Sequence, residues 1–213
     1  MRPPTFTPPY DSPIEEVFAY AIVKYLDADV DFHTQYPVET LCGRFRLDFV
    51  AEVGARKVGF ECDGAEFHDE GHDEWRDAMI LGDHKVDAIY RLRGTDIHRR
   101  LDDCLHLLAR LEPELFSERG RMNLRTLATP RLREFEWDEA GKGPDVLMVS
   151  WPALPDEPSS RDELVRIFVR NRSAIAGVGR EQFWLKLYRF AVAHGGGTLE
   201  SVMHASRTTV GAF

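Results

Sequence analysis

The stretch FRLDFVAEVGARKVGFECDGAEFH, residues 45–68, decides the fold that we expect for this chain. It contains two apolar segments, residues 44–53 and 56–63, which we predict to be strands joined by a short turn at Gly54. A hairpin of this kind pairs the strands antiparallel and brings Asp48 beside Glu61. Because side chains alternate along a strand, Glu61 and Asp63 are expected on one face and Cys62 on the other.

Asp48, Glu61 and Asp63 would repel one another on one face of a sheet unless a cation neutralised them or some took up protons. Mg²⁺ prefers oxygen ligands of this kind. Charged side chains are also seldom buried in apolar strands without a partner, so we predict a metal role for Asp48 and Glu61. For Asp63 the alternative is a turn residue, since Asp-Gly is a common turn pair.

The composition is that of an ordinary globular chain. It has 213 residues, of which 43% are hydrophobic and 30% charged, which fits one domain with an appendage. No apolar run is long enough to span a bilayer, and the N-terminus lacks the apolar core of a signal peptide, so we expect a cytoplasmic protein that does not enter the membrane. Three widely spaced cysteines without a Cys-x-x-Cys pair indicate neither a disulfide framework nor a zinc knuckle.

The net charge of −9 weakens the case for a nucleic-acid partner without excluding it. Acidic residues are concentrated in the first 120 residues, which hold 14 Lys and Arg against 25 Asp and Glu. Residues 121–213 hold 13 against 11, so they are slightly basic. The acid lies where the metal site is predicted, and local basic patches can still bind phosphates.

The remaining elements of the first half follow from periodicity. Ser12 as N-cap and Glu15 three residues later have the form of a capping box, which starts a helix over residues 13–27. A strand over 31–38 precedes the hairpin, and a helix over 73–83, a strand over 88–93 and a helix over 97–111 follow it. The order α-β-β-β-α-β-α predicts an α/β fold with a mixed central sheet flanked by helices.

Several motifs in this order resemble the PD-(D/E)XK nuclease superfamily, in particular the branch similar to very-short-patch-repair endonucleases. The motifs are SPIEE from Ser12, QYPV from Gln35, RLDF from Arg46, FECDG from Phe60, FH from Phe67, RD from Arg76 and LRGTDI from Leu92. They cover about residues 12–112 and keep the order of the family. The resemblance implies a restriction-endonuclease-like core in residues 1–112.

The resemblance also implies roles for individual residues. Asp48 matches the aspartate that bridges metal ions, Glu61 matches the acidic residue of the second half-motif, and Asp63 stands where many members have lysine. Glu15 matches a first-helix glutamate that often completes the metal shell through water. Gln35 and His68 match positions near the site, with His68 as a proton donor or phosphate ligand.

The chemistry of phosphodiester hydrolysis agrees with these residues. It needs a hydroxide near neutral pH and neutralisation of charge on the phosphate and on the departing oxygen. Mg²⁺, or Mn²⁺ in its place, held by Asp48 and Glu61 would supply both, with Asp63 binding a second ion or orienting water. His68 or Arg76 would stand by the leaving group.

Some of these residues have simpler interpretations. Glu15 has a sufficient role in the capping box alone. Arg76 and Asp77 could pair with each other at a helix start. His68 and His72 are four residues apart, as in zinc metalloproteases, but Gly71 and the absence of glutamate after His68 argue against a zinc hydrolase.

Residues 113–213 are predicted to form a mainly helical C-terminal extension. We predict a strand over 145–151, a helix capped by Ser160 with Leu164, Ile167 and Phe168 on one side, and a helix over 181–194. Its basic residues, Arg166, Arg170 and Lys186 among them, either follow a nucleic-acid backbone or form a solvated helix face. The extension could also hold a protein partner or form a homodimer.

The sequence therefore predicts a metal-dependent endonuclease that acts on DNA. The principal alternative is a non-catalytic module on the same fold that binds nucleic acid or protein. A zinc hydrolase that uses His68 and His72 is a third, weaker hypothesis.

Overall fold

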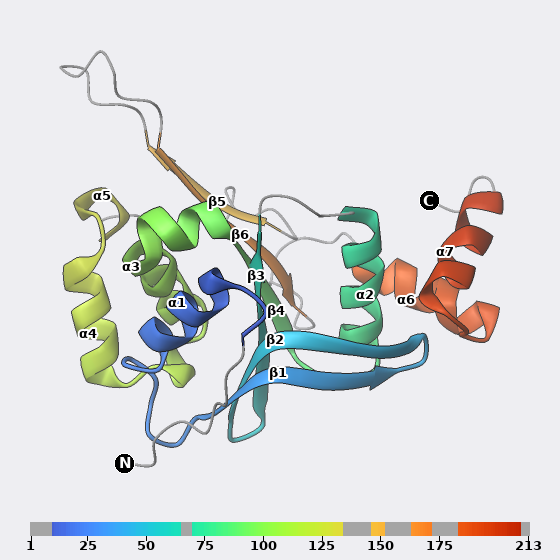
Figure 1. Cartoon of the computed structure of the whole chain (residues 1–213), viewed down its shortest axis with the longest axis horizontal. Helices are drawn as coiled ribbons and strands as arrows, with labels where there is room; N and C mark the ends of the chain where they lie inside the picture. Colours follow the sequence, from blue (N-terminus) through green and yellow to red (C-terminus); the bar gives the residue numbers. More distant parts are fainter. Residues whose placement is uncertain (1–9, 65–69, 134–145, 152–162, 172–182, 210–213) are drawn as a thin grey trace.

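A six-stranded mixed sheet forms the centre of the protein, in a computed structural model that describes residues 10–64, 70–133, 146–151, 163–171 and 183–209. The strands lie in the order β1-β2-β3-β4-β6-β5 (Figure 1). Their bounds are β1 Asp31–Thr40, β2 Gly43–Val53, β3 Arg56–Asp63, β4 Ala88–Arg93, β5 Val146–Trp151 and β6 Glu163–Asn171. Only β3 and β4 pair parallel; the other described neighbours are antiparallel.

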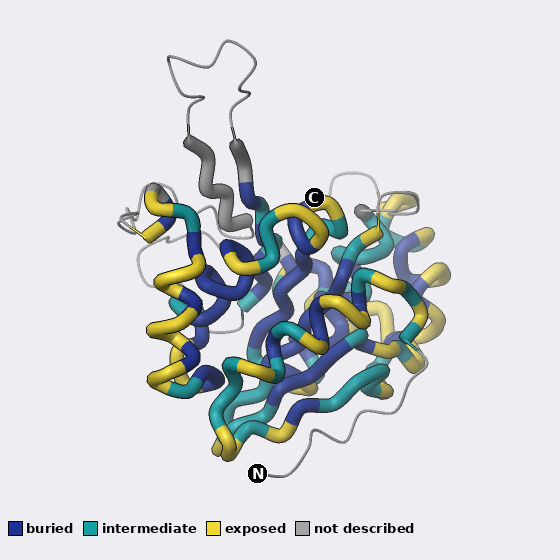
Figure 2. Tube along the Cα trace, turned by 60° about the vertical axis from the view of Figure 1, so that its left-hand side comes forward, coloured by how far each residue is buried: buried dark blue, intermediate teal, exposed yellow. Residues whose placement is uncertain are grey.

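Helices cover both faces of the sheet, so the predicted α/β class is confirmed (Figure 1). One layer contains α1 (Pro13–Ile22), α3 (Gly94–Leu111), the 3₁₀ turn η1 (Pro113–Leu115), α4 (Glu118–Leu127) and the short α5 (Pro130–Arg133). The other contains α2 (Glu70–Gly82), α6 (Phe183–His194) and α7 (Leu199–Thr208). Each layer has its own apolar core against the sheet, and exposed residues follow the outer helix faces (Figure 2).

The predicted hairpin is present with the predicted register. Val53 pairs with Arg56 and Phe49 with Phe60, and Gly54 adopts a φ of 56°, which glycine tolerates best. Strand β3 is buried on both faces because β2 and β4 flank it and helices lie above and below. Glu61, the charged residue inside the buried part of β3, is therefore forced into the protein interior.

The first helix begins as predicted but ends earlier. The Ser12 hydroxyl accepts a bond from the Glu15 N–H at 3.4 Å, and it donates to Glu15 Oε1 at 2.7 Å. The helix ends at Ile22 rather than near residue 27. The chain is then held by contacts to the segment after α3, including a β-bridge between Leu26 and Phe116.

The C-terminal half adds strands to the sheet. The helix predicted from Ser160 through Phe168 is wrong: residues 163–171 form β6, which pairs with β4. Alternate β-branched residues Val165, Ile167 and Val169 pack into the core beside α3, which a strand achieves and a helix does not. The predicted division at residue 112 is therefore not a division of the sheet.

The last part of the described chain packs on α2. The predicted helix over 181–194 is found as α6, and three glycines with positive φ, Gly195 to Gly197, follow its end. A Cβ on Gly196 would lie 2.3 Å from the Leu41 side chain, so only glycine fits there. In the described part of the chain, no helix combines the length and apolar character needed to cross a membrane.

Candidate active site

A pocket of about 350 Å³ opens where β3 ends, between the start of α1, the middle of β2, α2 and β4. Its charged lining consists of five carboxylates and two guanidinium groups: Glu15, Asp48, Glu61, Asp63, Asp73, Arg76 and Arg91. Asp48, Glu61 and Asp63, which the sequence analysis grouped, thus face one pocket. Carboxylates outnumber cations in this lining, so the pocket favours a positively charged ligand.

The strands reverse their side-chain alternation at the site. Along β1, Phe32 packs in the α1 layer and Val38 in the α2 layer; along β2, Phe49 packs in the α1 layer and Leu47 in the α2 layer. Residues two apart on a regular strand share a face, so both strands change face in between. The change falls between the pairs Thr34–Phe49 and Tyr36–Leu47, at Asp48 and at Gln35, whose φ is 50°.

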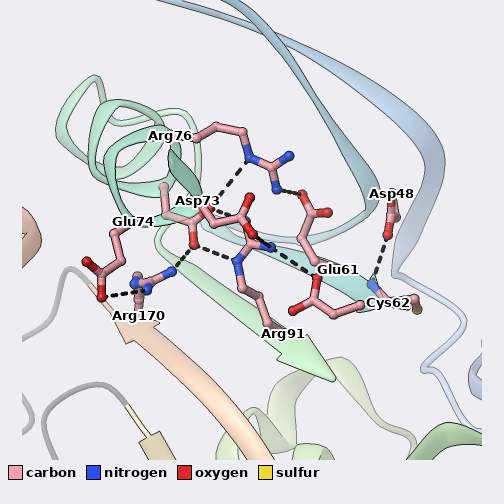
Figure 3. Close-up of polar contacts among 10 residues, drawn as sticks. Asp48, Glu61, Cys62, Asp73, Glu74, Arg76, Arg91 and Arg170 are labelled. Atoms are coloured by element: carbon pink, nitrogen blue, oxygen red, sulfur yellow. Dashed lines mark hydrogen bonds and ion pairs between the residues drawn. The ribbon is translucent and has the colours of Figure 1, made fainter. Parts of the chain in front are cut away.

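Asp48 is fixed by this irregularity. Backbone pairing of β2 with β3 runs from Phe49 and Phe60 to the hairpin. Beyond that pair, the Cys62 N–H donates to Asp48 Oδ2 at 2.8 Å (Figure 3). Burial is the main cause that raises the pKa of Asp48 to about 6; the Cys62 bond opposes this shift, and the charge of Glu15 adds to it.

Glu61 is the most perturbed carboxylate of the pocket. It is 5% exposed, and burial raises its pKa to about 8 despite the nearby charge of Arg76. Glu61 Oε1 lies 2.8 Å from Arg76 Nη2, but the two groups are not aligned for a hydrogen bond. Among the described residues neither atom has a hydrogen-bond partner, so Glu61 Oε1 has a charge contact but no hydrogen bond (Figure 3).

A second charge cluster lies next to this pair and is fully bonded. Asp77 of α2 is 0% exposed and accepts two hydrogen bonds from Arg91, at 2.8 and 2.7 Å, and one from Arg170 of β6. Burial by itself would raise the pKa of Asp77, but Arg91 and Arg170 outweigh it and lower the pKa to about 2. Arg170 thereby joins the C-terminal half to the site (Figure 3).

The other predicted metal ligands have protein partners. Asp63 Oδ1 accepts a bond from Arg91 Nη1 at 3.1 Å. Glu15 is buried and accepts bonds from the Ser12 hydroxyl, the Asp11 N–H and Gln35 Nε2, the last at 2.8 Å. Gln35 therefore stands behind Glu15 and is not part of the pocket lining.

The remaining predicted residues are spread over the molecule. His68 lies outside the described residues, and with it the zinc hypothesis; His72 lies 3.9 Å from Glu200 of α7. Arg170 is buried in the Asp77 cluster rather than on a surface, so a phosphate contact would require it to leave that cluster. Lys186 is exposed on α6. Arg166 is half-buried, and its backbone N–H donates to Asp96 Oδ2.

Two site residues were missed from the sequence, Asp73 and Arg91. Arg91 was assigned only to a strand, although a charged residue inside the apolar segment AIYRLR signals a buried partner. Asp73 and Asp77 are four apart and so share a helix face, which identifies the face of α2 that meets Arg91. Arg76 and Asp77, suggested as a pair, are only loosely paired, with 3.8 Å between Arg76 Nε and Asp77 Oδ1.

The donor set fits a hard divalent cation held by two carboxylates. Within the described ranges no group of three or more His, Cys, Asp or Glu side chains has the arrangement of a metal site. Mg²⁺, however, is commonly bound by one or two carboxylates, with water and substrate phosphate completing its shell. Asp48 and Glu61 offer these two carboxylates, and their raised pKa values indicate that the protein leaves their charge under-compensated.

A search with protein-family models gives no match to the chain, and neither curated proteins nor solved structures give one. Conclusions about function therefore rest on the site itself.

Proposed function

We propose that this protein is a metal-dependent nuclease that hydrolyses phosphodiester bonds of DNA on a restriction-endonuclease-like core. The observation that carries the proposal is the pair of half-buried Asp48 and buried Glu61, which line one open pocket and have pKa values raised to about 6 and about 8. Perturbed carboxylates in a cleft are typical of functional sites. The order of α1, three strands, α2, β4 and α3, together with the motif resemblance, supports the same class.

Asp48 and Glu61 would hold Mg²⁺, or Mn²⁺ in its place. A bound ion of this kind supplies a hydroxide at neutral pH and neutralises charge on the reacting phosphate. The Cys62 N–H keeps Asp48 in one orientation, so that ligand does not have to be ordered during binding. Asp63, fixed by Arg91, is placed on the same pocket to orient water.

The substrate phosphate would meet Arg76, the guanidinium of α2 that lines the pocket. Its Nε and Nη2 are buried without hydrogen bonds among the described residues, and phosphate oxygens are strong acceptors for such donors. Proton donation to the leaving oxygen by His68 stays a prediction from the sequence. Lys186 on the exposed side of α6 is available for a backbone phosphate outside the pocket.

The test is cleavage of supercoiled plasmid and of single-stranded DNA by the purified chain with Mg²⁺, Mn²⁺ or EDTA. Asp48→Asn and Glu61→Gln should each lose about 10³-fold or more in rate, because each removes a charged ligand. Glu39→Gln is the matched control, since Glu39 is an exposed carboxylate of β1 that pairs with Arg44. A folded wild type that cuts neither DNA under any condition would refute the proposal.

A non-catalytic DNA-binding module is the second candidate. It is favoured by one observation: the protein already places a cation, Arg76, against Glu61. In that case the carboxylate would not need a metal. DNA binding that is unchanged by EDTA and by Asp48→Asn, without strand scission, is the outcome expected for this alternative.

A further inference from the structure

Arg76 occupies one oxygen of the carboxylate that would hold a metal ion. Its Nη2 lies 2.8 Å from Glu61 Oε1, close enough that a cation bound to this oxygen would face a guanidinium at contact distance. Two positive groups cannot share one carboxylate oxygen without strong repulsion. The charge of Arg76 therefore opposes metal binding to Glu61 for as long as Arg76 stays in this position.

Arg76 is also the most loosely held of the three guanidinium groups around Asp77. Arg91 makes two hydrogen bonds to Asp77, and Arg170 makes a third. Both oxygens of Asp77 are thereby in use, and Arg76 approaches no closer than 3.8 Å. Its Nε and Nη2 have no hydrogen-bond partner among the described residues. Asp77 attracts Arg76 but cannot satisfy it.

An acceptor that enters the pocket would satisfy these donors. A phosphate group offers several oxygens in the fork-like geometry that a guanidinium matches. The Arg76 side chain is 19% exposed and lines the pocket, but its Nε and Nη2 are buried, so it has to turn for these donors to meet a phosphate. If Arg76 turns to a phosphate, Glu61 is released.

We propose that Arg76 is a substrate-coupling residue: it lies against Glu61 and repels a metal ion until a phosphate of the substrate draws it away, so that phosphate and divalent metal bind cooperatively. The inference rests on the proposed function and adds the order of events at the site. It explains how Glu61 can contact Arg76 in the free protein and still bind a metal ion when substrate is present.

Cooperative binding of phosphate and metal through Arg76 predicts how the DNA-free protein binds metal. Without Arg76, a metal ion no longer competes with a protein cation, so the DNA-free protein should bind the metal more tightly. Coupling between two ligands at one site is reciprocal, so the same residue should account for tighter metal binding in the presence of phosphate. Loss of Arg76 should weaken this coupling and slow DNA cleavage at the same time.

The experiment is calorimetric titration of the full chain with Mn²⁺, first without DNA. Arg76→Gln should bind Mn²⁺ about fivefold or more tightly than the wild type. Arg76→Lys, which keeps the charge, should stay near the wild type. Arg93→Gln is the matched control. Arg93 of β4 pairs with Asp96, so this substitution also removes one positive charge but leaves the contact at Glu61 unchanged. Glu61→Gln defines the loss of the site.

The second arm adds thymidine 5′-monophosphate as a phosphate probe. It should tighten Mn²⁺ binding by the wild type about fivefold or more, and by Arg76→Gln distinctly less. If Arg76→Gln binds Mn²⁺ no more tightly than Arg93→Gln, the competition is refuted. If Arg76→Gln does not fold, the Nε–H resonance of Arg76 in the wild type is followed by NMR, with Arg76→Lys used to assign it. This resonance must shift when Mg²⁺ is added. A resonance that does not move overturns the inference.

Failure of the two proposals can be told apart. Metal-dependent cleavage together with an unchanged Mn²⁺ affinity of Arg76→Gln would remove the coupling role and leave the nuclease. Tighter Mn²⁺ binding by Arg76→Gln in a protein that cuts no DNA would leave the competition at Glu61 and remove the nuclease. Equal Mn²⁺ binding by wild type and Glu61→Gln would overturn both.

Discussion

Two charge clusters lie side by side near the end of β3, and they differ in how completely the protein satisfies them. Around Asp77, two arginines fill both carboxylate oxygens, and the pKa falls to about 2. At half-buried Asp48 and buried Glu61, the only polar contacts among the described residues are one backbone N–H and one misaligned guanidinium, and the pKa values rise to about 6 and about 8.

The difference separates structure from function. A buried carboxylate that the fold satisfies is part of the scaffold, and its loss leaves unpaired charges behind. One that the fold leaves unsatisfied lowers stability and is retained only where a ligand uses it. The fully bonded cluster also fixes α2, β4 and β6 around the under-compensated one, so the first cluster builds the pocket that the second lines.

The largest effect should come from breaking the satisfied cluster. Asp77→Asn leaves Arg91 and Arg170 buried without their common anion, and we expect the free energy of unfolding to fall by about 3 to 5 kcal/mol. Urea denaturation measures this. Glu74→Gln is the control in the same helix. The Glu74 side chain is 39% exposed and its ion pair with Arg170 is long, at 3.7 Å, so this substitution should change the free energy of unfolding by less than about 1 kcal/mol. Comparable losses for both variants would contradict the comparison.

The second effect is a pH dependence of the unsatisfied pair. The pKa of Glu61 is raised from 4.5 to about 8 in the folded protein, so the native state holds a proton there that the unfolded chain releases. The contribution of this protonated Glu61 to the free energy of unfolding is complete below pH 4.5 and is lost as the pH rises toward 8. In EDTA, we expect the free energy of unfolding to fall by about 2 to 4 kcal/mol over this window.

Urea denaturation at several pH values measures this slope. Glu61→Gln cannot titrate and should show a flatter dependence, while Glu39→Gln should keep the slope of the wild type. An identical slope in Glu61→Gln would assign the pH dependence to other groups.

The third effect is stabilisation by metal. Mg²⁺ at about ten times its dissociation constant should raise the free energy of unfolding by about 1.4 kcal/mol, provided that only the folded state binds it. The measurement is thermal or urea unfolding with and without Mg²⁺ at pH 8, where Glu61 is about half ionised before the metal binds. Asp48→Asn and Glu61→Gln should lose the stabilisation, and Asp77 is left intact in both. Equal stabilisation by Mg²⁺ of the wild type, Asp48→Asn and Glu61→Gln would mean that the metal binds elsewhere.

The smallest effect should come from Glu15, which lines the pocket but accepts three hydrogen bonds, from Asp11 and Ser12 just before α1 and from Gln35 of β1. Glu15→Gln should cost about 1 kcal/mol of stability through the helix start. It should lower Mn²⁺ affinity by about tenfold at most, as expected for a residue beyond the direct ligands. Calorimetry measures this affinity, and a loss as large as that of Glu61→Gln would make Glu15 a direct ligand.

Much of the fold could be predicted because its signals are local. Gly54 between two apolar segments gives the hairpin and its register, and Ser12 with Glu15 gives the helix start. The error over residues 160–168 has a physical origin. Leu164, Ile167 and Phe168 have helical spacing, but Val165, Ile167 and Val169 have strand spacing, and pairing with β4 decided between them. No local signal in the sequence describes that pairing.

The sequence by itself determined which carboxylates meet, since hairpin pairing and alternation bring Asp48, Glu61 and Asp63 to one end of the sheet. Only the tertiary structure decided their electrostatic state. The reversal at Gln35 and Asp48, the contact of Arg76 with Glu61, and the arrival of Arg170 at Asp77 join residues up to 93 positions apart. A pKa depends on burial and on neighbours in space, and the fold alone sets both.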